Sequence, residues 1–247
     1  MSNELGHTPW TAWLVRLQLL LVAVLVLGLV SVRFSLLPFS TGFSGFALAL
    51  VSMAALAALA LIALIISWFK GAKTWQAPAL RAIVIGVAPI AVIMLLVGPA
   101  GFKVPPIHDI STDLIDPPEF VAAQAERTAE ENSLDHGGPE LAKMQSTNYP
   151  NIRPLRVQAS TEQTFTRAQA VVKDFGWRVI RVDAEAGVIE AVEETAVFGF
   201  KDDLIIRVLP TEEGSQVDVR SVSRVGVSDL GANAKRIHRV LSAMTET

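Results

Sequence analysis

The stretch LIIRVLPTEEGSQVDVRSVS, residues 204–223, consists of two runs rich in valine and isoleucine on either side of the turn PTEEG at 210–214. Such runs around a turn that contains proline and glycine predict a β-hairpin. Successive side chains of a strand point to opposite faces, so Val217 and Asp218 lie on different faces. If the strands pair symmetrically about the turn, Arg207 lies opposite Asp218 as a cross-strand ion pair. The sequence therefore predicts an antiparallel hairpin with a charged face.

Further elements are predicted on both sides of this hairpin. Ser160 and Gln163 have the spacing of a capping box and open a helix, for which Gly176 is a candidate C-terminal cap. A last helix is expected to begin near Ser228 or Asp229, with the apolar stripe Leu230, Ala234, Ile237, Leu241 and Met244. Strands are predicted at Leu155 and Val157 and over 177–182, 188–193, 197–208 and 216–223. The order strand, helix, four strands, helix predicts an α+β fold, a mainly antiparallel sheet covered on one face by two helices.

The first hundred residues have a different composition from the rest. They carry five basic side chains and one acidic one, whereas residues 101–247 carry sixteen basic and twenty-three acidic side chains. Three apolar runs without charges, over 17–32, 43–69 and 82–100, match the roughly 20 residues with which a helix crosses a hydrocarbon core. The sequence therefore predicts three transmembrane helices. Close helix packing is expected at Gly28, Gly42, Gly45 and Gly86.

Flanking charge predicts the orientation of these spans, because basic loops tend to stay on the cytoplasmic side. One side carries Arg16, Lys70, Lys73 and Arg81, together with four tryptophans suited to a membrane interface, Trp10, Trp13, Trp68 and Trp75. The other side carries only Arg33 and Lys103 near the membrane. A signal peptide is the competing interpretation of the first run, but two further spans follow it. We expect a multi-pass protein of the inner membrane whose C-terminal domain is periplasmic.

Three regions are predicted: a membrane domain over 1–103, a proline-rich connecting segment over 104–150 and the α+β domain over 151–247. In the connecting segment, Asp116 is a candidate N-cap for a short helix from Pro117 to about Glu131. The same segment contains His108, Asp109, Asp113 and Asp116, which together could ligate a divalent metal. Their spacing matches no ligand motif, and aspartates between prolines are common in solvated turns.

Four segments carry a resemblance to a known family. They are PPIHDISTDLIDPPEF (105–120), YPNIRPL (149–155), FGFKDDLIIRV (198–208) and DVRSVSRVGVSDLGANAKRI (218–237). In this order they resemble the motifs of the domain-of-unknown-function 1499 family, a group of bacterial and plastid proteins, over roughly residues 104–243. The three preceding spans are similar to the membrane form of that family. The resemblance implies no activity and no catalytic residue.

The last of these segments suggests an anion site. Arg220 and Arg224 are an even number of residues apart and share a strand face, and the free amides at a helix start attract anions. The candidate ligand-binding residues are Arg220, Arg224, Ser228, Asp229, Asn233 and Arg236. In the alternative, structural interpretation, Ser228 or Asp229 caps the helix, and the arginines pair with Asp202, Asp203 or Glu190. Asp202 and Asp203, as strand neighbours, do not converge on one substrate.

Two functions follow from these observations. The first is a membrane protein whose outer domain binds a partner protein or an anionic ligand without catalysis. The second is a metal-assisted envelope hydrolase or lipid-modifying enzyme that uses His108, Asp109 or Asp113. The chain has no cysteine, which excludes disulfides and thiolate chemistry. We expect no cofactor, a lipid bilayer and an envelope protein as partners, and no nucleic acid, because the domain is acidic.

Overall fold

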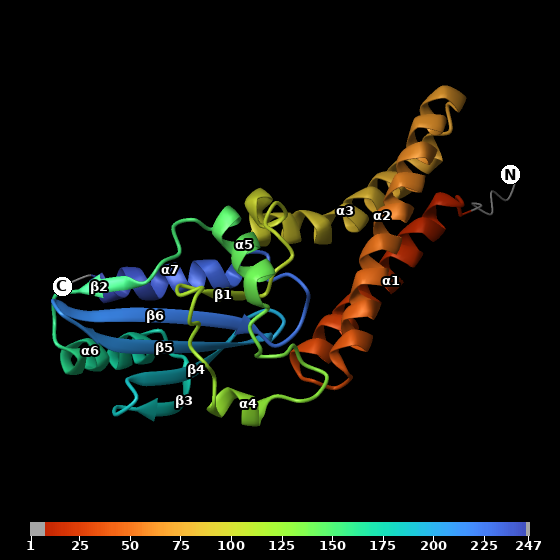
Figure 1. Ribbon diagram of the computed structural model, residues 1–247. Coiled ribbons are helices and arrows are strands. Elements are labelled where there is room, and N and C mark those ends of the chain that lie inside the picture. Colours follow the sequence, from red (N-terminus) through yellow and green to blue (C-terminus); the bar gives the residue numbers. More distant parts are fainter. Residues whose placement is uncertain (1–7, 246–247) are drawn as a thin grey trace, which may run out of the picture. The chain divides into compact units, whose positions relative to one another are not determined.

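The computed structural model describes residues 8–245 and consists of two compact units, Met1–Pro99 and Ala100–Thr247 (Figure 1). The first unit contains the helices α1 (Thr11–Arg33) and α2 (Phe39–Lys70) and nearly all of α3 (Lys73–Gly101). All three are long and apolar enough to cross a membrane, as the sequence predicted. Pro38 precedes α2, and α2 is capped at its C-terminus by Gly71, whose left-handed backbone does not continue the helix.

A buried glutamine joins the three apolar helices. The Gln18 side chain is fully buried, and its amide nitrogen donates to the carbonyl oxygens of Met53 (2.9 Å) and Ala82 (3.2 Å). These acceptors belong to α2 and α3, so one side chain of α1 ties all three helices together. Hydrogen bonds between helices partly replace the hydrophobic drive that lipid does not provide. The sequence prediction did not identify this contact.

Three of the four predicted packing glycines lie at close helix contacts. A Cβ on Gly28 would lie 2.9 Å from the Phe46 amide nitrogen, and one on Gly42 would lie 3.0 Å from the Val32 side chain. At Gly86 it would lie 2.3 Å from the Gln18 amide nitrogen. A Cβ on Gly45 would have no atom within 4 Å, so the prediction of close packing at that glycine was wrong.

The second unit is built on one antiparallel sheet. Its strands are β1 (Asp109–Ser111), β2 (Leu155–Val157), β3 (Arg178–Asp183), β4 (Val188–Glu194), β5 (Lys201–Thr211) and β6 (Gly214–Ser223). They lie in the order β1-β6-β5-β4-β3, and β2 also pairs with β6. Its helices are α4 (Ala122–Glu126), α5 (Gly138–Asn148), α6 (Thr161–Asp174) and α7 (Ala232–Thr245). The α+β prediction is confirmed, and the sheet gains a strand, β1, that was not predicted.

The central hairpin has the predicted register. Arg207 of β5 lies opposite Asp218 of β6, and their side chains form an ion pair with a nitrogen-to-oxygen distance of 3.0 Å. At the start of α6, Ser160 and Gln163 form the predicted capping box. The chain reverses after α6 at Gly176, which has a φ of 69°. Local sequence signals therefore determine both the hairpin and this helix.

Three predicted boundaries were wrong. Strand β5 begins at Lys201 instead of residue 197, because the preceding chain forms a turn in which the Thr195 amide donates to the Phe200 carbonyl. Helix α7 begins at Ala232 instead of residue 228 or 229, after a loop that the Asp229 side chain closes. Helix α4 covers only Ala122–Glu126 instead of 117–131, and a carboxylate from β4 takes the place of the predicted cap.

The two faces of the sheet have different coverings. Helices α6 and α7 pack on one face and close the main apolar core, which includes Phe165, Ile206 and Ile237. The opposite face carries a smaller cluster with Phe120 and Ile205, under the segment that contains α4. On this second face most of the remaining buried side chains are charged. The candidate site residues are therefore divided between the two faces of the sheet.

Candidate functional site

Strand β6 places its alternate side chains on the two faces of the sheet. Arg220 and, just beyond the strand, Arg224 lie on the α4 face, where both have carboxylate partners. Ser221 and Ser223 lie on the other face, where they contact Asn233 of α7. The sheet therefore separates the predicted anion-binding residues into two groups.

Arg220 is a buried side chain whose guanidinium is fully engaged. It is 2% exposed, and its Nε and Nη2 donate to the two Asp109 carboxylate oxygens at 3.0 and 2.8 Å. Its Nη1 donates to the Pro118 carbonyl, and Nη2 also donates to the Leu134 carbonyl. The Phe120 ring lies 5.3 Å from the guanidinium carbon. This paired, bidentate geometry is one in which a buried arginine is tolerated.

Arg224 belongs to a second cluster on the same face. Its Nε and Nη2 contact the fully buried Asp203, with a shortest distance of 2.7 Å, and Nη2 also donates to Glu126 at 3.0 Å. Arg127 reaches Asp203 from the other side at 2.7 Å. The hydrogen bond from Arg178 and the contact with Arg224 lower the pKa of Glu126 from an ordinary 4.5 to about 2. Glu126 is therefore ionised throughout the neutral range.

Arg236 forms a polar cluster on the α7 face. Its guanidinium contacts the carboxylates of Asp202 and Glu193, and its Nη1 donates to the Ser221 hydroxyl at 2.9 Å. Asn233 completes the cluster: its oxygen accepts from the Ser221 hydroxyl at 2.8 Å. Its Nδ2 donates to the His108 carbonyl at 2.9 Å. The cluster fixes the start of α7 on the ends of β5 and β6.

Ser228 and Asp229 shape the loop that precedes α7. The Asp229 carboxylate accepts from the amides of Gly231 (2.8 Å) and Asn233 (2.7 Å). The Ser228 hydroxyl accepts from the Leu230 amide at 3.3 Å. Burial raises the pKa of Asp229, and the amides of Asn233 and Gly231 oppose that shift. A carboxylate thus occupies the amides that the anion-site hypothesis left free.

The carboxylates considered for catalysis or metal binding are also paired. Asp202 and Asp203 contact Arg236 and Arg224 on opposite faces, as predicted for strand neighbours. Arg207 contacts Asp113 at 3.3 Å and Asp116 at 2.9 Å, in addition to Asp218. Among residues 8–245, no group of three or more histidine, cysteine or acidic side chains is arranged to hold a metal ion. The four proposed metal ligands therefore do not converge.

Two buried polar side chains organise the domain in ways that the sequence did not predict: Glu190 was expected to pair with Arg220 or Arg224 but contacts Arg181 and the start of α4, and Gln145 was not considered. Glu190 of β4 is fully buried, and its oxygens accept from the amides of Val121, Ala122 and Ala123 at 2.9–3.1 Å, which caps α4. Gln145 of α5 makes two hydrogen bonds to the Ser111 backbone and so covers the outer edge of β1. The partners lie 67–69 and 34 residues apart, so no local pattern indicates them.

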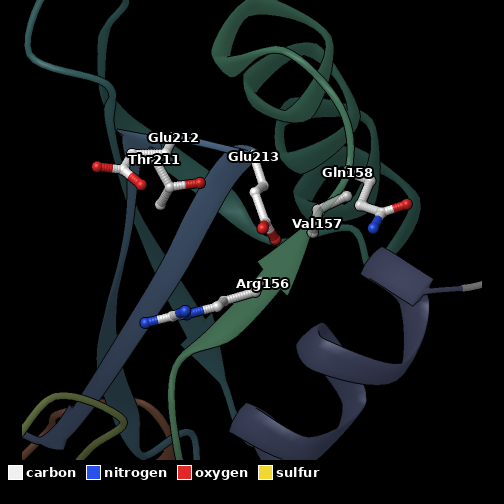
Figure 2. Close-up of a pocket in the computed structure, with 6 residues that line it drawn as sticks. All are labelled: Arg156, Val157, Gln158, Thr211, Glu212 and Glu213. Carbon is white, nitrogen blue, oxygen red and sulfur yellow. The ribbon is translucent and has the colours of Figure 1, made fainter.

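An open groove of about 450 Å³ lies where β2 meets the turn between β5 and β6. Figure 2 shows Glu213 reaching down from that turn toward Val157, while Arg156 extends from β2 below it. The lining residues are Arg156, Val157, Gln158, Thr211, Glu212 and Glu213. Most are solvent-exposed and polar, and their charges are of both signs. The groove is thus a polar surface feature, separate from the buried clusters.

The comparison with protein families decides the family of the chain. The family model described as protein of unknown function (DUF1499) matches residues 109–244. The chain belongs to this family. No curated protein matches it. The DUF1499 match starts at β1 and ends inside α7, so it includes the sheet and both helices of its main core.

Three of the four segments quoted from the sequence meet in the buried clusters. The first supplies Asp109, the third supplies Asp202 and Asp203, and the last supplies Arg220, Arg224 and Arg236, their partners. Residues that are distant in the chain thus become paired at the ends and edges of the central strands. In this structure these segments hold the domain together through buried ion pairs.

Proposed function

We propose that this DUF1499 protein is a multi-pass protein of the inner membrane whose C-terminal domain faces the periplasm and binds a partner without catalysis. The observation that carries the proposal is the pairing of the arginines at Arg220, Arg224 and Arg236 with carboxylates inside the domain. Arginine and carboxylate side chains that are paired in this way stabilise the fold and are not available to bind a substrate or to exchange a proton with it.

The packing of the membrane helices supports the proposed orientation. The rings of Trp10 and Trp75 lie 5.6 Å apart at the ends of α1 and α3 that carry the predicted cytoplasmic charges. The Arg16 guanidinium lies over the Trp13 ring at 4.6 Å at the same end. Aromatic and basic side chains gathered at one end are typical of a membrane interface, and the charge excess favours the cytoplasmic side.

The groove at β2 is the binding surface that fits this proposal better than the arginine clusters. An anion at Arg220 or Arg224 would have to displace a carboxylate that is already in place, at a cost in desolvated charge. The groove offers exposed charges of both signs, Arg156 on one wall and Glu212 and Glu213 on the other. Such a surface suits a polar segment of a partner protein, whose charges can pair with both walls.

A photocrosslinking residue at Glu213 in native membranes tests the proposal. We expect one reproducible crosslinked species that is lost when Arg156→Glu reverses the charge of the facing wall. The matched control is the same crosslinker at Glu185, an exposed residue of the β3–β4 turn. The same adducts at both positions, or none at Glu213, would refute the groove as a partner site. Stabilisation by phosphate over chloride at equal ionic strength would instead favour the anionic-ligand alternative.

A further inference from the structure

The loop at residues 226–231, between β6 and α7, is held at many points. The Gly226 carbonyl accepts from Asn132 Nδ2 at 2.9 Å, and the Asp229 amide donates to the Ile107 carbonyl at 3.2 Å. The Asp229 carboxylate binds the amides of Gly231 and Asn233 within the same turn. We call residues 226–231 the apolar loop. These contacts fix its backbone, so the directions of its side chains are fixed too.

The apolar loop displays two aliphatic side chains to solvent. Val227 is 75% exposed and Leu230 is 38% exposed. Leu230 also has a φ of 53°, a left-handed conformation that costs a bulky residue roughly 1 kcal/mol. The sequence predicted Leu230 on the apolar stripe of the last helix, but it lies in this strained loop before α7 and belongs to neither apolar cluster of the domain. This combination indicates that the side chain has a role on the surface.

The apolar loop lies close to the point where the chain leaves the third span. A Cβ on Gly231 would lie 3.6 Å from the Val104 side chain. Val104 is only three positions after Gly101, the end of α3, and three residues reach at most about 11 Å. Gly98 interrupts α3 with a φ of 72°, and the uninterrupted part before it, residues 73–97, extends about 38 Å, against a hydrocarbon core of about 30 Å, so this helix is long enough to reach the headgroup layer.

We propose that the apolar loop docks on the lipid bilayer that holds the spans, with Val227 and Leu230 inserted at the headgroup level. Phe102, which is 51% exposed, directly follows the end of α3 in the chain and is a further apolar side chain near the span end. Lys103 follows Phe102 in the chain, and the Lys235 amide donates to the Gly231 carbonyl of the apolar loop; both side chains are exposed and suit anionic headgroups. The domain is linked covalently to the third span, so docking of the loop is intramolecular and even a weak contact with the bilayer is effective. The proposal holds for either orientation of the spans and is independent of the proposed partner.

The absence of cysteine from the sequence permits a direct test with the full chain. A spin label on Val227→Cys is compared with one on Val182→Cys, in liposomes of phosphatidylcholine and phosphatidylglycerol. Val182 is 49% exposed and lies in β3, near the β3–β4 turn, on the edge strand that is three strands away from β6 in the sheet. We expect a several-fold lower accessibility to a water-soluble nickel reagent at residue 227 than at residue 182. Equal accessibility at the two positions would overturn the proposal.

Hydrogen exchange of the unlabelled chain provides a second readout, because a label can itself favour lipid. The peptide that contains residues 226–231 should exchange several-fold more slowly in liposomes than the same peptide of the Val227→Asp, Leu230→Asp variant. Both residues are exposed, so the variant is expected to fold. Protection of the native loop in native membranes but not in pure lipid would overturn lipid docking and indicate a protein partner.

Discussion

At the scale of single residues, buried ion pairs dominate this domain. Replacing Arg220 with glutamine leaves Asp109 buried without its partner, which costs about 3–5 kcal/mol. The matched control is Arg178→Gln, because the Arg178 side chain is 55% exposed and its pair with Glu126 is worth under about 1 kcal/mol. Hydrogen exchange of β6 amides in the full chain measures both. Similar losses in the two variants would contradict the structural role of Arg220.

Glu126 makes the stability of the domain depend on pH. Its pKa falls to about 2 in the folded protein because Arg178 and Arg224 bind the charged form. A lowered folded pKa stabilises above the unfolded value of 4.5, and this contribution is lost as the pH falls toward 2. We expect the native chain to be more stable than Glu126→Gln at neutral pH, with a difference that shrinks between pH 4.5 and 2. A difference independent of pH would contradict this assignment.

The sequence could identify these residues but not most of their partners. The prediction paired Arg207 with Asp218 correctly, because both belong to one hairpin whose turn sets the register. It also offered Asp203 as a partner of Arg224. The pair of Arg220 with Asp109 joins residues 111 positions apart, and nothing local encodes such a contact. The burial of the arginines, which decides whether their charges are free, follows from that long-range pairing.

At the scale of elements, the β3–β4 turn depends on a glycine. Gly187 has a φ of 66°, and an added Cβ would lie 2.3 Å from the Val208 carbonyl oxygen on β5. Gly176 has a similar φ of 69°, but a Cβ added there would have no atom within 4 Å, so Gly176→Ala measures the backbone effect alone, about 1 kcal/mol. We expect Gly187→Ala to destabilise the domain clearly more than Gly176→Ala in urea unfolding. Equal losses would mean that the turn moves to make room.

The membrane helices allow a parallel comparison. At Gly86 an added side chain would clash with Gln18 and with the Met53 carbonyl of α2, whereas Gly45 of the same unit faces open space. We expect Gly86→Leu to lower the thermal stability of the helices in detergent and to weaken the hydrogen bonds of Gln18. Gly45→Leu should leave both unchanged. Equal losses of stability in both variants would mean that the loss comes from packing against lipid and not from contact between the helices.

Element boundaries were less predictable than element types. Helix α6 matched its prediction because its cap residues Ser160 and Gln163 are adjacent to it in the chain. Helix α4 did not, because its amides are satisfied by Glu190, which the chain reaches only after α6 and β3. Strand β1 was missed for the same reason: its pairing with β6 and its cover by Gln145 are tertiary contacts. Local caps can be predicted, and tertiary caps cannot.

At the scale of the whole molecule, the distribution of charge predicts which side of the membrane holds the DUF1499 domain. Fusing green fluorescent protein, which does not become fluorescent when exported unfolded, to the C-terminus should give dark cells. Alkaline phosphatase, active only outside the cytoplasm, should be active at the same position. The bias rests on few charges, so replacing Lys70, Lys73 and Arg81 with glutamine should give a mixed topology and partial fluorescence. Bright cells with the native chain would place the domain in the cytoplasm; the ion pairs would keep their structural role, while the periplasmic partner would have to be abandoned.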